Sequence, residues 1–186
     1  MNVLALDLGT KTGWATLWDD GSGCSGVQVF DLKRGESPGM RYLRLGRWLE
    51  DEAHAFVDLV VFEQAHHRGG AATSVCEKLI GRVEECCADW GMEHQAVHSA
   101  TLKKWATGNG RASKGDMIDA AANIGKRLPQ LQRLADDFME RYNAWCDKEK
   151  PNRAKVASSE WTDEADAICL LGYALSEIVP AGKRGR

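Results

Sequence analysis

Apolar residues recur at two different spacings along this chain, and the spacing predicts the type of each element. Alternating or continuous apolar runs predict strands, whereas apolar residues three or four positions apart predict helices. The predicted strands cover residues 2–8, 14–18, 26–32, 57–63 and 93–97. The predicted helices cover residues 40–56, 72–90, 101–106, 114–127, 131–148 and 161–179. Glycine-containing turns at 9–13 and 19–23 join the first three strands, which predicts an antiparallel meander.

The order of these elements predicts the fold class. Three strands, a helix, a strand, a helix, a strand and then further helices indicate an α/β domain with a mixed five-stranded sheet flanked by helices. The 186 residues contain no internal repeat and no linker, so we expect one domain over residues 1–186 that ends in a short basic tail, 180–186. A polar segment, residues 148–159, predicts a loop before the last helix.

The composition is typical of a soluble globular protein, at 44% hydrophobic and 27% charged residues. No apolar stretch approaches the roughly 18 residues of a membrane span, and the N-terminus lacks the basic start of a signal peptide. We therefore expect a cytoplasmic protein with no membrane partner. The six cysteines form no C-x-x-C pair, which favours free thiols. A zinc site of Cys86 and Cys87 with His94 or His98 is the alternative.

The net charge of −3 argues against a protein that binds phosphates over its whole surface. Nucleic-acid binding would have to use local basic patches. One candidate patch follows the fourth predicted strand and comprises His66, His67 and Arg68. A second comprises Lys103, Lys104, Arg111 and Lys114. Trp105, within the second patch, is either a core residue or a platform on which a base stacks.

Two carboxylates end apolar strands, where stability alone would not place them. Asp7 ends the first strand and Glu63 the fourth. A lone carboxylate in a buried strand costs free energy unless it is paired or holds a metal. If the two strands are parallel neighbours, the two residues stand about 5 Å apart. Local alternatives exist: Asp7 could accept hydrogen bonds from the Gly9 turn, and Glu63 could pair with Arg68.

Two further carboxylates, Asp163 and Asp166, begin the last predicted helix. Their spacing of three places them on one side of the helix, at the edge of its apolar stripe, so both can face the sheet. Taken alone, Asp163 could simply be an acid favoured by the helix dipole. Four gathered carboxylates repel one another, and magnesium ions with oxygen ligands resolve that repulsion. Two such ions about 3.5–4 Å apart can promote phosphodiester hydrolysis, so the pattern predicts a metal-dependent nuclease.

Four segments, in order and across nearly the whole chain, resemble motifs of the RuvC family of Holliday-junction resolvases, in the RNase H-like superfamily. ALDLGTKTGWA, around Asp7, resembles the first motif, and VFEQ, around Glu63, the second. KKWATGNGRASK, ending at Lys114, resembles the glycine-rich stretch that carries the family's lysine. DEADA, which contains Asp163 and Asp166, resembles the last motif.

The resemblance implies an RNase H-like fold and a two-metal site of Asp7, Glu63, Asp163 and Asp166. The metal would be Mg²⁺, for which Mn²⁺ can substitute, and Lys114 would contact the scissile phosphate region. The resemblance also implies a homodimer that makes paired nicks in four-way DNA junctions and leaves 5′-phosphate ends. Helix 72–90 is the candidate dimer interface, and an ordinary core helix is the alternative.

Two departures from the bacterial pattern favour the viral (bacteriophage) branch of the family. The loop after Glu63 is basic and contains two glycines. An insertion between Lys114 and Asp163 adds the helix 131–148 and the loop that follows it. The viral branch often accepts other branched DNA, so we expect a broader substrate range in a virus-encoded protein acting in the bacterial cytoplasm.

Two other motif assignments are excluded because each requires a second motif that the chain lacks. DEAD at 163–166 spells a helicase box, but the chain has no phosphate loop to accompany it. Asp7-Leu-Gly-Thr also resembles a phosphate motif of actin-like kinases and chaperone ATPases, whose second phosphate loop is missing here. An RNA-processing nuclease of the same superfamily and a non-catalytic DNA-structure-binding protein remain as alternatives. The presence of all four acids counts against the binding protein.

Overall fold

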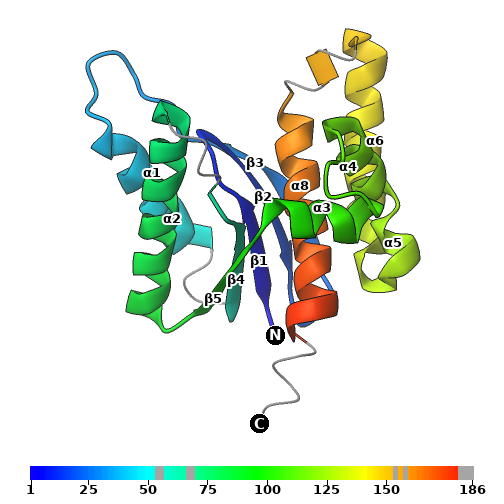
Figure 1. The fold of residues 1–186 in the computed structure, drawn as a ribbon, viewed down its shortest axis with the longest axis horizontal. Coiled ribbons are helices and arrows are strands. Elements are labelled where there is room, and N and C mark those ends of the chain that lie inside the picture. Colours follow the sequence, from blue (N-terminus) through cyan, green and yellow to red (C-terminus); the bar gives the residue numbers. More distant parts are fainter. Residues whose placement is uncertain (53–56, 66–69, 153–154, 157–158, 180–186) are drawn as a thin grey trace.

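A mixed five-stranded sheet with the order β3-β2-β1-β4-β5 forms the centre of the computed structural model (Figure 1). Strands β1, β2 and β3 pair antiparallel, whereas β4 lies parallel to β1 and β5 parallel to β4. The structure describes residues 1–52, 57–65, 70–152, 155–156 and 159–179. The strands are β1 (Val3–Asp7), β2 (Lys11–Leu17), β3 (Gly23–Val29), β4 (Leu59–Glu63) and β5 (Glu93–Val97). The predicted α/β class and mixed five-stranded sheet are confirmed.

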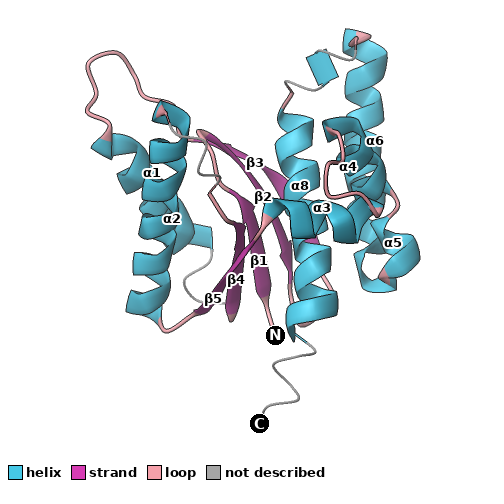
Figure 2. Cartoon of the chain, viewed as in Figure 1, coloured by secondary structure: helices cyan, strands magenta, loops and turns pink. Residues whose placement is uncertain are grey.

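Helices cover both faces of this sheet (Figure 2). One face carries α1 (Gly39–Glu52) and α2 (Ala71–Trp90). The other face carries α3 (Ser99–Thr107), α4 (Lys114–Ala122), α5 (Ile124–Arg127), α6 (Gln132–Glu149) and α8 (Glu160–Tyr173). Of these, α8 lies directly across β1 and β2. In the described part of the chain, no helix combines the length and apolar character that a bilayer crossing requires.

The alternation of side chains along β1 and β4 decides which face the strand-end acids join. Val3 and Ala5 of β1 pack in the core beneath α8, whereas Leu4 and Leu6 pack in the core beneath α1 and α2. β4 alternates in the same way. Because successive side chains of a strand point to opposite faces, Asp7 and Glu63 both continue the α8 face.

The first hairpins differ from the prediction by a few residues. The predicted turn 9–13 is shorter, because β2 already begins at Lys11 and pairs with both of its neighbours. Thr12 closes this turn, since its hydroxyl donates to the Gly9 carbonyl over 2.9 Å. β3 covers Gly23–Val29 and starts three residues earlier than predicted. The reason is the tight loop before it, in which the Asp20 carboxylate accepts from the backbone and hydroxyl of Ser22.

Two predicted helices are interrupted. The helix predicted over 114–127 divides at Asn123 into α4 and α5, because the Asn123 side chain donates to the Asp119 carbonyl over 2.8 Å and competes with the helical pattern. The last helix, predicted as regular to residue 179, widens after Tyr173 into a π-helical segment, η2 (Ala174–Ile178). A single 3₁₀ turn, η1 (Pro129–Leu131), leads into α6.

Helix α6, which the family resemblance predicts to be an insertion, is part of the main core. Leu134, Ala135 and Phe138 of α6 are buried in the same core as α8. On its other edge, Arg141 reaches the buried Glu164 of α8 and donates from Nη2 to Oε1 over 2.7 Å. The Ser25 hydroxyl of β3 donates to the same oxygen over 2.6 Å. Helix α6 therefore joins the last helix to the edge of the sheet.

The zinc alternative does not fit the positions of its candidate ligands. Cys86 and Cys87 are buried in the core beneath α2, while the His94 ring stacks on Phe62. His98 caps α3, with its Nδ1 accepting from the Ala100 backbone over 3.2 Å. All six cysteines are free thiols, as predicted.

Candidate active site

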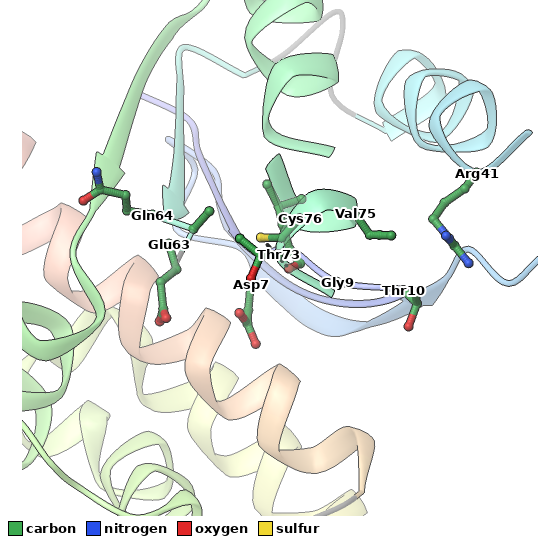
Figure 3. A pocket seen from close by; sticks show the side chains of 11 residues that line it. Asp7, Gly9, Thr10, Arg41, Glu63, Gln64, Thr73, Val75 and Cys76 are labelled. Atoms are coloured by element: carbon green, nitrogen blue, oxygen red, sulfur yellow. Dashed lines mark hydrogen bonds between the residues drawn. The ribbon is translucent and has the colours of Figure 1, made fainter. Parts of the chain in front are cut away.

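Asp7 and Glu63 lie side by side at the carboxyl-terminal edge of the sheet. The β1–β4 ladder pairs Leu6 with Phe62, and the two acids are the next residue of each strand. Figure 3 shows both carboxylates pointing from the strand ends toward α8. The turn after Asp7 is held by Thr12 and not by the Asp7 carboxylate, so the local alternative for Asp7 does not describe the contacts seen.

The start of α8 is brought to the same edge by a glycine. Gly13 of β2 is the register partner of Asp7. A Cβ atom at Gly13 would overlap the backbone carbonyl oxygen of Asp163, so the absence of a side chain lets the first turn of α8 rest directly on β2. Asp163 and Asp166, three positions apart on that helix, thus lie next to the ends of β1 and β4.

Burial and repulsion within the acid group raise the pKa of carboxylates at this site. Burial raises the pKa of Asp7 well above its ordinary value, and repulsion from Asp166, Glu63 and Asp163 adds to the effect. Burial, followed by repulsion from Glu63, raises the pKa of Asp166 to about 7. Burial also raises the pKa of Asp163. Three elements distant in sequence therefore place four acids within electrostatic reach of one another.

One oxygen of this group is buried without a partner. Asp166 Oδ1 has no hydrogen bond in the described part of the chain. A buried polar atom in this condition is uncommon and costs free energy. A hard cation suits such a site, because all the donors are carboxylate oxygens. Among the described residues, no group of three His, Cys, Asp or Glu side chains is close enough together to hold a metal ion as it stands. Closer approach of four repelling carboxylates requires a cation between them.

Lys114 stands at the edge of the acid group. Its Nζ donates to the hydroxyl of the buried Thr162 over 3.4 Å, and its charge opposes the rise in the pKa of Asp163. The position is fixed by a capping box: Ser113 accepts from the Asp116 backbone, and the Asp116 side chain accepts from the Ser113 backbone. Lys114 is therefore the first residue of a firmly capped helix that begins beside the acids.

The predicted second basic patch is divided by the structure. Lys103 lies near the acids, since its charge opposes the rise in the pKa of Asp166. Lys104, the next residue of α3, lines a different hollow with Trp105 and Tyr173. Arg111 is exposed in the connection between α3 and α4. The other predicted patch, His66, His67 and Arg68, lies outside the described residues.

Trp105 packs as a core-facing residue and not as an open platform. Its ring meets Tyr173 edge-on, with 5.9 Å between centroids. The guanidinium of Arg127 lies 4.2 Å from the Trp105 ring centroid, on which it forms a cation–π contact. These contacts favour the core interpretation of Trp105.

Two basic residues of the site were not singled out from the sequence. Lys11 donates from Nζ to Glu160 Oε1 over 2.8 Å, and its charge opposes the raised pKa of Asp163. Arg41 of α1 lines a cavity of about 590 Å³ that also contains Asp7 and Glu63 (Figure 3). The sequence held a signal for each: Lys11 lies within the first motif, and Arg41 begins an arginine series on one side of α1.

The cavity that contains Arg41 lies on the α1 and α2 side of the acids. Thr10, Thr73 and Cys76 also line it. Arg41 Nε donates to the Phe30 carbonyl over 3.0 Å, which aims the guanidinium without neutralising it. The cavity thus offers a positive charge on the side of Asp7 opposite to Lys11 and Lys114.

The comparisons with known proteins identify a shared fold. No protein-family model matches the sequence, and no curated protein matches it. The chain is similar to a structure of RuvC from Thermus thermophilus, with 19% sequence identity and a TM-score of 0.58 over 94% of this chain and 96% of that one. It is also similar to T. thermophilus RuvC in complex with Holliday junction substrate, at 19% identity and a TM-score of 0.61 over 94% and 93% of the two chains. At this identity the similarity shows a RuvC-like, RNase H-like fold.

Proposed function

We propose that this protein is a divalent-metal-dependent endonuclease that cuts branched DNA, with the four-way junction as its principal substrate. The observation that carries the proposal is the approach of four carboxylates, from β1, β4 and α8, around a buried Asp166 oxygen that has no partner in the described structure. A fold has no structural reason to gather four mutually repelling acids, whereas a metal-dependent phosphodiesterase requires such a group.

The residues proposed to hold the metal are Asp7, Glu63, Asp163 and Asp166. Two Mg²⁺ ions fit this all-oxygen donor set, and Mn²⁺ is the expected substitute. When bound, the ions would supply the activation of a water molecule and the stabilisation of the leaving oxygen. The carboxylates would orient the ions and hold them at the sheet edge, because the two strand ends and the docked helix fix three of the directions from which ligands approach.

The surrounding cations are proposed to hold the DNA backbone. Lys11, Lys103 and Lys114 lie on the α8 side of the acids, and Arg41 lies on the α1 side. A strand that crosses the sheet edge would meet positive charge on both sides of its scissile phosphate. This arrangement reconciles phosphate binding with a net charge of −3, because the basic residues are local to the site.

The choice of branched DNA rests on the fold and on the sequence motifs together. One of the solved structures with this fold is RuvC in complex with Holliday junction substrate. Paired nicks on a two-fold symmetric junction call for two sites related by a two-fold axis, so we propose a homodimer. The basic sequence after Glu63 and the inserted α6 support assignment to the viral branch, with a substrate range that includes other branched DNA.

The proposed dimer contact through α2 has to use its exposed side. Leu79, Val83 and Cys86 are already buried in the core of the protomer, so the core-helix alternative accounts for the apolar stripe of α2. The exposed side of α2 carries charged residues of both signs, namely Glu77, Lys78, Glu84, Glu85 and Asp89. A dimer formed there would be polar and sensitive to salt.

A nicking assay on a panel of substrates tests the proposal. The panel contains a synthetic four-way junction, a flap, linear duplex DNA and structured RNA, each with Mg²⁺, Mn²⁺ or EDTA. Metal-dependent cutting of the junction in preference to duplex is the expected result. Preferential cutting of RNA would instead support an RNA-processing nuclease. Junction binding without cutting in any metal would support a non-catalytic DNA-structure-binding protein.

A further inference from the structure

A second hollow of about 470 Å³ lies between α6, α8 and the edge strand β3. It is distinct from the cavity that contains Arg41, and the inserted helix provides one of its walls. Its lining includes Trp145, Trp161, Arg141, Lys11 and Glu160. Neither the four acids nor the proposed metal ions account for this hollow, which no motif in the sequence had suggested.

The hollow has an aromatic wall. The rings of Trp145 and Trp161 lie 6.0 Å apart between centroids, with 49° between their planes. Tyr142 packs against both rings from behind, at 6.0 Å and 5.7 Å. Both tryptophans are only partly buried, so each ring keeps some surface open to the hollow. Fixed, flat apolar surfaces of this kind suit a planar heterocycle, because stacking needs no further ordering of the protein.

The hollow also has positioned polar groups. Arg141 is held by Glu164, with Nη2 to Oε1 at 2.7 Å and Nη1 to Oε2 at 3.2 Å. At the rim, Lys11 and Glu160 form an ion pair of 2.8 Å in which both side chains are about half exposed. An apolar surface with a few convergent polar groups is the usual composition of a small-molecule or nucleotide site.

The hollow is a neighbour of the acids. Glu160, on its rim, precedes Asp163 by three residues on α8, which is a rise of about 4.5 Å along the helix. Glu164, at its floor, directly follows Asp163 in sequence. Lys11 lies between the two places, since it pairs with Glu160 and also acts on Asp163. The rim of the hollow therefore lies about one helical turn from the acids.

We propose that this hollow accepts one unstacked nucleobase of the strand being cut, next to the scissile phosphate, with the base stacked on Trp145 and in contact with Trp161. The inference rests on the proposed nuclease function. It gives the inserted helix α6 a role: α6 supplies Trp145 and Arg141 and thereby makes cutting depend on a base that can leave the helical stack. Bases at a branch point unstack at the lowest cost, so the hollow favours branched substrates.

Photo-crosslinking tests the site without requiring cleavage. A four-way junction with 5-iododeoxyuridine at successive positions near the branch point is irradiated with the full-length Asp7→Asn protein, and the adducts are mapped by peptide mass spectrometry. We expect one position to give an adduct on Trp145 or Trp161. Adducts confined to other residues, or none at any position, would overturn the proposal.

A second experiment measures coupling between the base and the tryptophan. Abasic sites are placed one at a time around the cut, and cleavage rates are compared for the wild-type, Trp145→Phe and Trp145→Leu proteins. One abasic position should slow the wild type and Trp145→Phe about tenfold, in keeping with the loss of one aromatic–base stack, but should leave Trp145→Leu little changed. Equal abasic effects in all three proteins would contradict the base site while leaving the nuclease proposal intact. Failure of the wild type to cut any substrate would contradict the nuclease proposal, and the crosslinking result would then decide on the hollow alone.

Discussion

Gly13 of β2 lies directly beneath Asp163 of α8, so that a Cβ atom at Gly13 would overlap the Asp163 carbonyl oxygen and stand 2.9 Å from the backbone nitrogen of Glu164. The obstruction is backbone, which cannot rotate away as a side chain can. Because Gly13 is also the register partner of Asp7, this single contact sets the separation between the acids of the sheet and the acids of the helix.

Gly13→Ala should therefore harm both stability and cutting. The added methyl group must push α8 away from β2, at a cost of about 1–3 kcal/mol in the free energy of unfolding. Chemical denaturation and the nicking assay measure the two effects. Gly81→Ala is the matched control, since a Cβ atom at Gly81 of α2 meets nothing within 4 Å and alanine favours a helix by up to about 1 kcal/mol over glycine. Equal behaviour of the two variants would contradict the role given to Gly13.

Asp7→Asn should abolish metal-dependent cutting while preserving junction binding. It should also raise the melting temperature of the metal-free protein, because burial and three other carboxylates disfavour the charged form of Asp7 and asparagine cannot ionise. For a chain of this size, each kcal/mol gained corresponds to about 2–4 °C. Mg²⁺ should stabilise the wild type and have little effect on the variant, as thermal melts in Mg²⁺ and in EDTA would reveal. Asp51→Asn, at an exposed position of α1, is the control and should resemble the wild type.

The stability of the metal-free protein should fall as the pH rises from about 4 to 7. The folded pKa of Asp166 is raised to about 7, above the roughly 3.9 expected in an unfolded chain, so the folded state binds more protons within this window. Unfolding releases those protons, and the free energy of unfolding therefore decreases as the pH rises. Urea denaturation at several pH values in EDTA measures the trend, which Asp166→Asn should flatten. A stability that increased through this window, with a slope unaltered in Asp166→Asn, would count against the raised pKa.

Arg41→Gln should weaken DNA binding about tenfold. It should also reduce the slope of the logarithm of the binding constant against the logarithm of the salt concentration by about one, because one phosphate contact is lost. Arg41 lines the cavity beside Asp7, and its guanidinium donates to the neutral carbonyl of Phe30. Fluorescence anisotropy with a labelled junction at several salt concentrations measures both quantities. Arg47→Gln is the control, because Arg47 lies on the same helix but is exposed and does not line the cavity. If both variants lost the same affinity, the loss would come from the lower positive charge of the protein and not from the position of Arg41.

Lys103 and Lys104 should differ sharply although they are adjacent. Lys103→Met removes a charge that acts on Asp166, and we expect the cutting rate to fall at least about tenfold. Lys104→Met alters the hollow beside Trp105 and Tyr173, so cutting should change less than about twofold. Single-turnover cleavage rates compare them directly. A larger loss for Lys104→Met would show that the DNA follows the α3 surface away from the acids.

The pattern of the sequence was sufficient to predict the sheet and to single out the four acids that the structure brings together, but not Lys11 or Arg41. Apolar period and element order indicated the five strands, and the two strands that carry acids, β1 and β4, were the plainest because burial on both faces leaves a continuous apolar run. The strand-end acids could be recognised in the sequence because a charged residue at the end of an apolar run conflicts with burial. Boundaries were less certain where a single side chain decides them, as at Asn123, whose amide competes for a backbone carbonyl of α4.

The sequence alone therefore determined the α/β fold and named Asp7, Glu63, Asp163 and Asp166, because periodicity and misplaced charge are local properties of a chain. Only the tertiary structure decided that Gly13 is the surface on which α8 rests, that Lys103 and Lys104 serve different surfaces, and that α6 forms a hollow beside the acids. The physical reason is the same in each case. These relationships depend on which faces of distant elements pack together, and packing between elements leaves no periodic trace in either of them.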